Sequence, residues 1–338
     1  MTSVEVTTVA DDLAVLHDGA TVIRRDALEP DTTYEVQGTE FRTLARPHGE
    51  LLCRFATAND VHFGEVEAGR IGDHTDGPIQ RARPGDPPYP EVMNRGAVAE
   101  ITAIDPVAVV VKGDLSQDGT DDEWAAFEAC YRTAFGHRLH VVRGNHDAYR
   151  MQSGYSGDQR IEVPGAVVAL LDTVIPGQTT GTLRPEQIEW LDAVAADTDL
   201  PVLAMGHHQQ WIPGGDDDHR SEGYFGMDPD ASDALAAVTA RRTNILCYTA
   251  GHTHRHRVRR MSSGVPTIEI GCVKDFPGTW AEYRVYEGGV MQVVHRISSP
   301  DALDWSERCR HLYADFGIDY STYAMGRLEE RCCIIPLR

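Results

Sequence analysis

Asn145, His146 and Asp147 stand side by side in the stretch VVRGNHD, directly after an apolar run that stops at Gly144. An amide, an imidazole and a carboxylate are all groups that can bind metal ions or move protons. Such a turn could also be polar simply because it is exposed to solvent. Whether other parts of the chain bring similar groups to the same place decides between these two interpretations.

Four further apolar runs end in polar donors of the same kind. Asp60 and His62 follow LLCRFATA, Asp114 follows VAVVVKG, His207 follows LPVLAMG, and His252 and His254 follow ILCYTAG. In four of the five segments, a glycine before the first donor allows a sharp backbone turn. Because ligands of parallel α/β sheets bind beyond the carboxyl ends of the strands, we expect all five segments to direct their side chains to one place.

The assembled set has seven oxygen and nitrogen donors and no sulfur: Asp60, His62, Asp114, Asn145, His207, His252 and His254. Imidazoles and carboxylates gathered without a cation would carry large desolvation and repulsion costs. Such ligands suit zinc, iron, manganese or cobalt. Seven donors are too many for one tetrahedral centre, but they suit two metal ions that share a carboxylate, which is a known clamp for displacement at phosphorus.

The ordered set D-x-H, GD, GNHD, GHH and GHxH covers residues 60 to 254 and resembles the calcineurin-like metallophosphoesterase superfamily. Within that superfamily, GNHD together with GHH and GHTH is most similar to the class III cyclic-nucleotide phosphodiesterases and the glycerophosphodiesterases. Purple acid phosphatases carry a tyrosine three residues after the bridging aspartate. Gln117 stands there in this chain, so an iron–tyrosinate centre is not expected.

The resemblance implies a role for each donor at a centre of two divalent or trivalent ions, with manganese, iron, zinc and cobalt all left open. Asp60, His62 and His254 would hold the first metal, Asn145, His207 and His252 the second, and Asp114 would bridge the two. His146 is implied to be no ligand but a catalytic residue that faces the substrate phosphate.

The function that the resemblance implies is metal-dependent hydrolysis of a phosphodiester, such as a cyclic nucleotide or a glycerophosphodiester, by attack of a metal-bridging hydroxide. His146 would stabilise charge on the phosphate or protonate the leaving alkoxide. Two alternatives stay open: a phosphomonoesterase of the same fold, and a non-catalytic metal-binding scaffold. The sequence holds no P-loop, nucleophile elbow or HExxH motif that would support another catalytic chemistry.

Several polar residues beside these motifs have structural interpretations. Asp147 is expected to orient a neighbour by hydrogen bonding, and His208 could do the same or contact the substrate. His256 and the arginines of HTHRHRVRR are expected to be surface or strand-edge charge. Lys274 and Asp275, in GCVKDFPG, could line the pocket.

An α/β core with parallel strands is predicted to position the donors. From Leu51 on, apolar runs alternate with segments of helical period, of which 121–135 is the clearest because Trp124, Phe127 and Tyr131 fall on one face. Such alternation is typical of a parallel sheet. With the resemblance, the predicted fold class is an α/β four-layer αββα sandwich with a small N-terminal β appendage.

The chain is predicted to divide into three parts. Residues 1–49 resemble a truncated fibronectin type III module, because LEPDTTYEV matches its Leu-x-Pro-x-Thr-x-Tyr segment, whose tyrosine caps a corner of the sandwich. Residues 50–299 would form the binuclear metallophosphoesterase domain and residues 300–338 a polar, partly helical tail. Two long irregular loops, at 64–90 and 209–229, could border the site.

The charge balance limits the possible partners. The 338 residues carry a formal net charge of −21, from 31 basic and 52 acidic residues, so duplex nucleic acid and anionic membranes are not expected partners. No secretory signal or membrane-spanning run is seen, and the seven cysteines form no CxxC, which predicts a cytoplasmic protein. A small phosphate ester is the expected partner, and the tail could form a homodimer.

Overall fold

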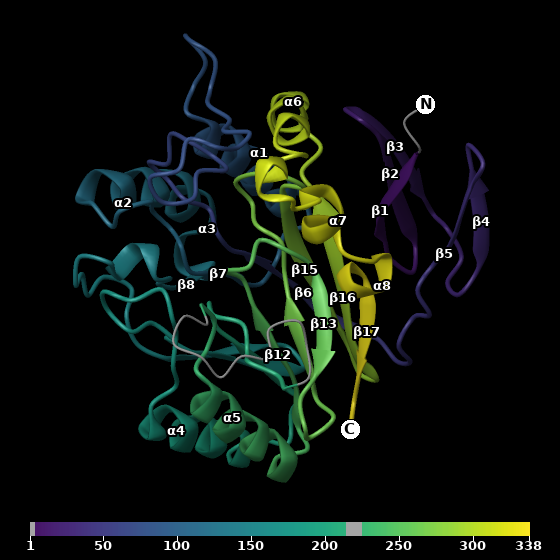
Figure 1. Ribbon diagram of the computed structural model, residues 1–338. Helices are drawn as coiled ribbons and strands as arrows, with labels where there is room; N and C mark the ends of the chain where they lie inside the picture. The colour runs from purple at the N-terminus through teal and green to yellow at the C-terminus, as the bar shows by residue number, and fades with distance from the viewer. Residues whose placement is uncertain (1–3, 214–224) are drawn as a thin grey trace.

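The computed structural model describes residues 4–213 and 225–338, and two six-stranded sheets packed face to face form its centre (Figure 1). The first sheet consists of β6 (Leu51–Ala58), β7 (Val109–Lys112), β8 (Leu139–Val142), β15 (Thr279–Tyr286), β16 (Gly289–Arg296) and β17 (Cys333–Pro336). The second consists of β9 (Gln159–Val163), β10 (Ala166–Leu170), β11 (Val202–Met205), β12 (Ile245–Ala250), β13 (Arg257–Arg260) and β14 (Pro266–Glu269).

Parallel strands lie side by side in both sheets. The first sheet has the order β17-β16-β15-β6-β7-β8, and its strands β6, β7 and β8 run parallel. The second has the order β13-β14-β12-β11-β10-β9, and β10, β11, β12 and β14 run parallel. Since the alternating segments become parallel strands, the predicted α/β core is confirmed.

Helices cover the outer face of each sheet, which completes the predicted four-layer αββα sandwich (Figure 1). The first sheet is covered by α1 (Tyr89–Ala103), α2 (Asp121–Phe127), a π-helical turn (Glu128–Arg132) and α3 (Thr133–Phe135), and the second by α4 (Pro185–Ala196) and α5 (Pro229–Arg241). Short 3-10 turns lie at Gly136–Arg138, His146–Ala148 and Ala314–Phe316, and the C-terminal helices are α6 (Pro300–Arg308), α7 (Tyr320–Met325) and α8 (Leu328–Arg331).

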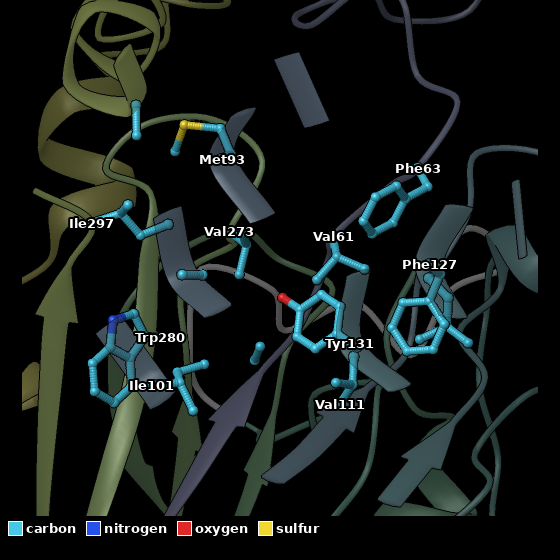
Figure 2. Packing of buried hydrophobic residues seen from close by; sticks show 14 of the residues in the cluster. Val61, Phe63, Met93, Ile101, Val111, Phe127, Tyr131, Val273, Trp280 and Ile297 are labelled. Carbon is cyan, nitrogen blue, oxygen red and sulfur yellow. The ribbon is translucent and has the colours of Figure 1, made fainter. Parts of the chain in front are cut away.

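The helical stretch predicted over 121–135 follows from its sequence. Thr120 caps its start with a capping box to Glu123, and Phe127 and Tyr131 bury the apolar face against the first sheet. In Figure 2 the Tyr131 ring lies next to Val61, and the Phe127 ring lies on the other side of Tyr131, below Phe63. The helical layer therefore reaches the loop that follows β6.

The loop after β6 is held by the buried residues that it packs against. Val61 is fully buried, its carbonyl accepts a hydrogen bond from Asn94 Nδ2 at 2.9 Å, and Tyr131 in turn donates to Asn94 Oδ1 at 2.8 Å. Burying a valine side chain contributes about 1.5–3 kcal/mol. Core packing thus positions the residues on either side of Val61.

The N-terminal residues form two small antiparallel sheets beside the first large sheet. One consists of β1 (Glu5–Val9), β2 (Leu13–Asp18) and β3 (Thr21–Asp26), and the other of β4 (Thr33–Val36) and β5 (Thr39–Arg42). Tyr34 Oη accepts a hydrogen bond from the Glu29 backbone N–H at 2.8 Å, a link back to the chain just upstream, as in a tyrosine corner. The predicted division of the chain at residues 49 and 299 stays a proposal. The last part is not separate from the middle part, since its strand β17 pairs with β16 of the first large sheet.

Within residues 4–213 and 225–338, none of the helices has both the length and the apolar character needed to cross a membrane.

Candidate metal centre

The donors predicted from the strand ends lie together where the two sheets meet. Asp60 and His62 follow β6, Asp114 follows β7 and Asn145 follows β8 of the first sheet, and His207 follows β11 and His252 and His254 follow β12 of the second. We call Asp60, His62 and His254 the first half of the centre, and Asn145, His207 and His252 the second half.

Asp114 lies between the two halves. Its Oδ2 is 3.4 Å from His62 Nε2 of the first half, and its Oδ1 is 3.4 Å from His207 Nε2 of the second. In the first half, the ligand atoms of Asp60, His62 and His254 lie within 4.8 Å of one another. A carboxylate with one oxygen toward each half has the placement needed to bridge two cations.

The second half is equally close. Asn145 Oδ1 is 3.0 Å from His207 Nε2. The nearest ring nitrogens of His207 and His252 lie within 4.8 Å of each other, and the His252 backbone N–H donates to Asp60 at 3.0 Å. The backbone of β12 therefore ties the second half to the first.

Five of the seven donors have a left-handed backbone, with φ between 46° and 68°: Asp60, His62, Asp114, His252 and His254. This region is sparsely populated by residues other than glycine, although Asp and His enter it more readily than most. Each such residue costs on the order of 1–3 kcal/mol, and strain of this kind clusters at functional sites. The left-handed turns therefore lower the stability of the fold, and they direct these side chains toward the centre.

Glycines beside the donors leave room for them. A side chain at Gly144 would collide with the Asp114 carboxylate, and one at Gly251 would meet Asp60 Oδ2 at 2.6 Å. The sequence analysis assigned these glycines to sharp turns, but of the four glycines before the donors only Gly113 has a positive φ, of 85°. The structure adds that the carboxylates occupy the space in which a side chain would stand.

Burial and neighbouring charge oppose each other at the centre. Burial alone would raise the pKa of Asp114, but His207 and His146 outweigh it and hold that pKa well below its usual range. Burial would lower the pKa of His207, yet the Asp114 carboxylate raises it to about 9. The pKa of His252 falls to about 3 through burial and the charge of His207. The carboxylates thus hold positive charge beside them.

The donor set fits a pair of metal ions. His62 Nε2 is buried 3.4 Å from Asp114 and, within the part of the chain that the structure describes, forms no hydrogen bond. A buried polar atom without a partner costs free energy unless a ligand binds it. Imidazole, carboxylate and amide oxygen are ligands of zinc, iron, manganese and cobalt.

Contacts that were not predicted from the sequence hold the donors in place. Gln117 Oε1 lies 3.2 Å from His62 Nδ1, the Lys112 carbonyl 2.9 Å from His207 Nδ1, and the Phe225 carbonyl 2.8 Å from His252 Nε2. Asn145 Nδ2 donates to Tyr149 Oη at 2.6 Å, which turns the amide oxygen toward His207. The spacing Asn145-x-x-x-Tyr149 was the one visible signal, since four residues make one helical turn.

His146 lies at the edge of the centre and is partly exposed. Its backbone N–H donates to Asp114 Oδ1 at 3.0 Å, and its ring Nδ1 is 2.9 Å from the Gln117 carbonyl. Its ring packs edge-on against His62 at 4.7 Å between centroids. Burial lowers its pKa although Asp114 opposes the shift. The Gln117 carbonyl can only accept, so it takes the Nδ1–H and leaves Nε2 as the other ring nitrogen.

Two neighbours play structural roles. The Asp147 carboxylate accepts from the backbone N–H groups of Leu115 at 3.0 Å and Gly144 at 2.8 Å, so it orients neighbouring loops as predicted. His208 has Nδ1 2.8 Å from Thr173 Oγ1 and Nε2 3.0 Å from the Thr179 carbonyl. Since both ring nitrogens contact protein groups, the hydrogen-bonding interpretation of His208 is favoured over substrate contact.

The stretch HTHRHRVRR was expected to be surface or strand-edge charge; β13 is an edge strand, but the surface alternative is wrong for three residues. His256 is buried, and Arg255 and Arg259 form ion pairs with the buried Glu269 at 2.7 and 3.2 Å. The reason is tertiary, because the C-terminal residues cover this strand and the Ala324 carbonyl accepts from the His256 N–H.

Lys274 also turns away from the pocket role considered for it, because it forms a buried ion pair with Glu65 at 2.5 Å. Of the two long loops, residues 64–90 are described and largely irregular. In the other loop, residues 214–224 lie outside the described residues. Whether either loop borders the substrate stays a prediction.

A four-layer αββα sandwich with aspartate, asparagine and histidine donors at its strand ends defines a metallophosphoesterase. The family described as calcineurin-like phosphoesterase matches residues 53–256, more than half of the chain. The chain belongs to this family, and the resemblance seen in the motifs is confirmed.

Relatives with known names are distant. Over 180 residues the chain is 28% identical to the 3',5'-cyclic adenosine monophosphate phosphodiesterase CpdA of Pseudomonas aeruginosa, covering 51% of this chain and 63% of the relative. Over 109 residues it is 28% identical to a probable cyclic nucleotide phosphodiesterase of Synechococcus, covering 30% and 42%. The chain thus matches less than two thirds of the length of either relative.

Solved structures share the fold at low identity. A dimetal phosphatase from Danio rerio superposes with a TM-score of 0.57 at 18% identity, covering 73% of this chain and 98% of that one. A purple acid phosphatase from yellow lupin gives 0.53 at 12% identity, covering 85% and 57%. These similarities support the four-layer architecture.

Proposed function

We propose that the chain is a binuclear metal-dependent phosphodiesterase that acts on a small phosphodiester of the cyclic-nucleotide class. The observation that carries this proposal is the placement of Asp114, whose two oxygens each lie 3.4 Å from a histidine of a different half. A site for a single metal ion would not need a carboxylate whose two oxygens face two different groups of histidines.

In this proposal the first half and the second half would each hold one ion, and Asp114 would be a ligand of both. When bound, a pair of metal ions neutralises phosphate charge and lowers the pKa of water toward neutrality. The protein supplies rigid orientation, since the backbone and side-chain acceptors described above fix the rings of His62, His207 and His252.

His146 is the proposed catalytic residue. It is partly exposed, and Gln117 fixes its Nδ1, so its Nε2 is the nitrogen left to meet a substrate. Because the Nδ1–H is given to the Gln117 carbonyl, Nε2 carries a proton only in the imidazolium form. In that form the ring would donate to a phosphate oxygen or protonate the leaving alkoxide, and it would return to the neutral ring.

A diester is favoured over a monoester on two grounds. The relatives that match in sequence are named as cyclic nucleotide phosphodiesterases. In addition, Lys274 and Arg143 near the donor loops are engaged in buried ion pairs with Glu65 and Asp172. Neither cation is free to hold the second charge of a dianionic monoester.

The decisive experiment uses metal-stripped full-length protein reloaded with manganese, iron, cobalt or zinc. We expect turnover of bis-nitrophenyl phosphate and of a cyclic nucleotide to exceed that of nitrophenyl phosphate with the best metal. Faster hydrolysis of the monoester would favour the phosphomonoesterase alternative. Two bound metals per chain without any turnover would favour a scaffold. A cytoplasmic location and a homodimer stay predictions.

A further inference from the structure

Each histidine of the two halves turns one ring nitrogen away from the centre, toward an acceptor. The acceptors of His62, His207 and His252 are the Gln117 side-chain oxygen and the Lys112 and Phe225 carbonyls, all neutral. His254 differs, because its Nδ1 lies 3.7 Å from the Asp275 carboxylate while its Nε2 lies 3.6 Å from Asp60. One histidine of the four therefore lies between two carboxylates.

Asp275 is fully buried and only half satisfied. Its Oδ1 accepts from Tyr320 Oη at 2.7 Å and from Cys272 Sγ at 3.1 Å. Its Oδ2, the atom nearest His254 Nδ1, forms no hydrogen bond with any residue that the structure describes. A buried carboxylate oxygen is costly unless a donor reaches it, and the His254 ring is the donor at hand.

Lys274 lies near Asp275, but the hydrogen bonds of its ammonium go to Glu65. The Lys274 ammonium lies 2.5 and 2.7 Å from the two Glu65 oxygens and 3.8 Å from Asp275 Oδ2. Lys274 therefore adds positive charge near Asp275 Oδ2 without a hydrogen bond to it, and the His254 Nδ1 is the ring nitrogen that faces this oxygen.

The C-terminal helices hold both partners of this pair. Tyr320 is the first residue of α7, and its hydroxyl donates to Asp275. Tyr323, also on α7, donates from Oη to the Thr253 carbonyl at 3.1 Å, next to His254 in the chain. Trp305 of α6 donates from Nε1 to the Lys274 carbonyl at 2.8 Å, next to Asp275 in the chain. These helices are drawn in yellow in Figure 1. They lie outside residues 53–256, which the family match covers.

We propose that Asp275 is a positioning residue for His254: it accepts the Nδ1–H, keeps Nε2 directed toward Asp60, and is itself held by Tyr320. The inference rests on the proposed metal centre and adds residues to it. A carboxylate behind a ligand histidine makes the imidazole a stronger ligand, and loss of such a partner costs about 10- to 100-fold in metal affinity.

The test is a titration of metal-stripped full-length protein with Mn²⁺ by calorimetry, together with electron paramagnetic resonance of the bound manganese. We expect two binding steps in the wild type. Asp275→Asn should weaken one step about 10- to 100-fold and leave the other within a few-fold. At limiting Mn²⁺ the signal of a coupled pair should give way to that of a single ion.

Tyr320→Phe serves as the second variant if Asp275→Asn does not fold. Losing one hydrogen bond should weaken the same step about 2- to 10-fold. The matched control is Tyr286→Phe, which removes a tyrosine hydroxyl 3.4 Å from the buried Asp11 at the N-terminal sheets and should change neither step.

Two results would overturn the inference. Unchanged affinity for both ions in Asp275→Asn, or in Tyr320→Phe where the first variant is unfolded, removes the positioning role. A third bound ion that only Asp275→Asn abolishes would assign His254, Cys272 and Asp275, whose ligand atoms lie within 4.8 Å, to a site of their own. Wild-type protein that binds two ions but hydrolyses no ester would refute the proposed function and leave this inference standing.

Discussion

The two halves of the centre are similar in donors and different in what holds the donors. In the second half, His207 and His252 contact backbone carbonyls, and Asn145 contacts the neutral Tyr149 hydroxyl. In the first half, His254 lies between Asp60 and Asp275. Neutral acceptors fix orientation, whereas a buried carboxylate also adds charge. We therefore expect the first half to depend on a buried charge and the second on neutral carbonyl and hydroxyl groups.

The largest effect should come from removing the group that both halves share. Asp114→Ala should abolish binding of both ions. Loss of one electrostatic group usually lowers turnover about 10²- to 10³-fold, and we expect a larger decrease here because both ions are lost. Metal content by elemental analysis and turnover of bis-nitrophenyl phosphate measure this. Asp197→Ala, which removes a carboxylate with 74% exposure on the far helical layer, is the matched control. A variant that keeps two ions would refute the bridging role.

The second largest effect should be on turnover alone, with metal binding in both halves unchanged. His146→Ala is expected to bind two ions with unchanged affinity and to lose about 10²- to 10⁴-fold in turnover, because proton donation is removed without a ligand. Calorimetric metal titration and kcat report the two properties separately. Turnover equal to the wild type would take His146 out of the reaction, and lost metal would make it a ligand.

A pH series compares protein with and without metal. The pKa of His207, which burial would lower and Asp114 raises to about 9, is above its unfolded value of about 6.5. The raised pKa stabilises the metal-free fold below pH 6.5, and that contribution is lost as pH rises to about 9. Tm of metal-free protein should therefore fall on the order of 5 °C across this window, by scanning calorimetry.

Metal-loaded protein is the control for the pH series. Metal ions bind the deprotonated imidazole, so bound metal should remove this dependence and metal affinity should rise over the same window. A metal-free Tm that is flat from pH 6.5 to 9 would contradict the charge pairing of His207 with Asp114.

The smallest effect should separate the halves most sharply. Tyr149→Phe removes the hydroxyl 2.6 Å from Asn145 Nδ2, and should weaken the second ion about 10-fold with the first unchanged. Manganese titration beside Asp275→Asn would show whether the two variants affect different binding steps. Loss in the same step would mean that the halves are not independent.

The strand-end donors could be predicted from sequence because each directly follows an apolar run, and chain neighbours fix where such residues point. Asp275 was considered only as a pocket residue, and Tyr320 was not singled out, because their contact spans 45 positions of the chain. Phe225 was missed for a different reason. It contributes a backbone carbonyl, a group that every residue type has, so the sequence cannot indicate it.

The one wrong interpretation has the same origin. A run of arginines and histidines usually forms a solvated face, but Arg255 and Arg259 pair with the buried Glu269 under the C-terminal residues. Sequence patterns report the faces of a local element, and they do not report which distant segment later covers one of those faces.

The C-terminal origin of Tyr320 has a consequence for synthesis on the ribosome. All seven donors precede residue 255, whereas the tyrosine that fixes Asp275 and the edge strand β17 are translated later. A nascent chain thus presents every ligand before the last elements dock. Ion capture can therefore begin while translation is still under way, and docking of the final helices would then secure an ion already in place.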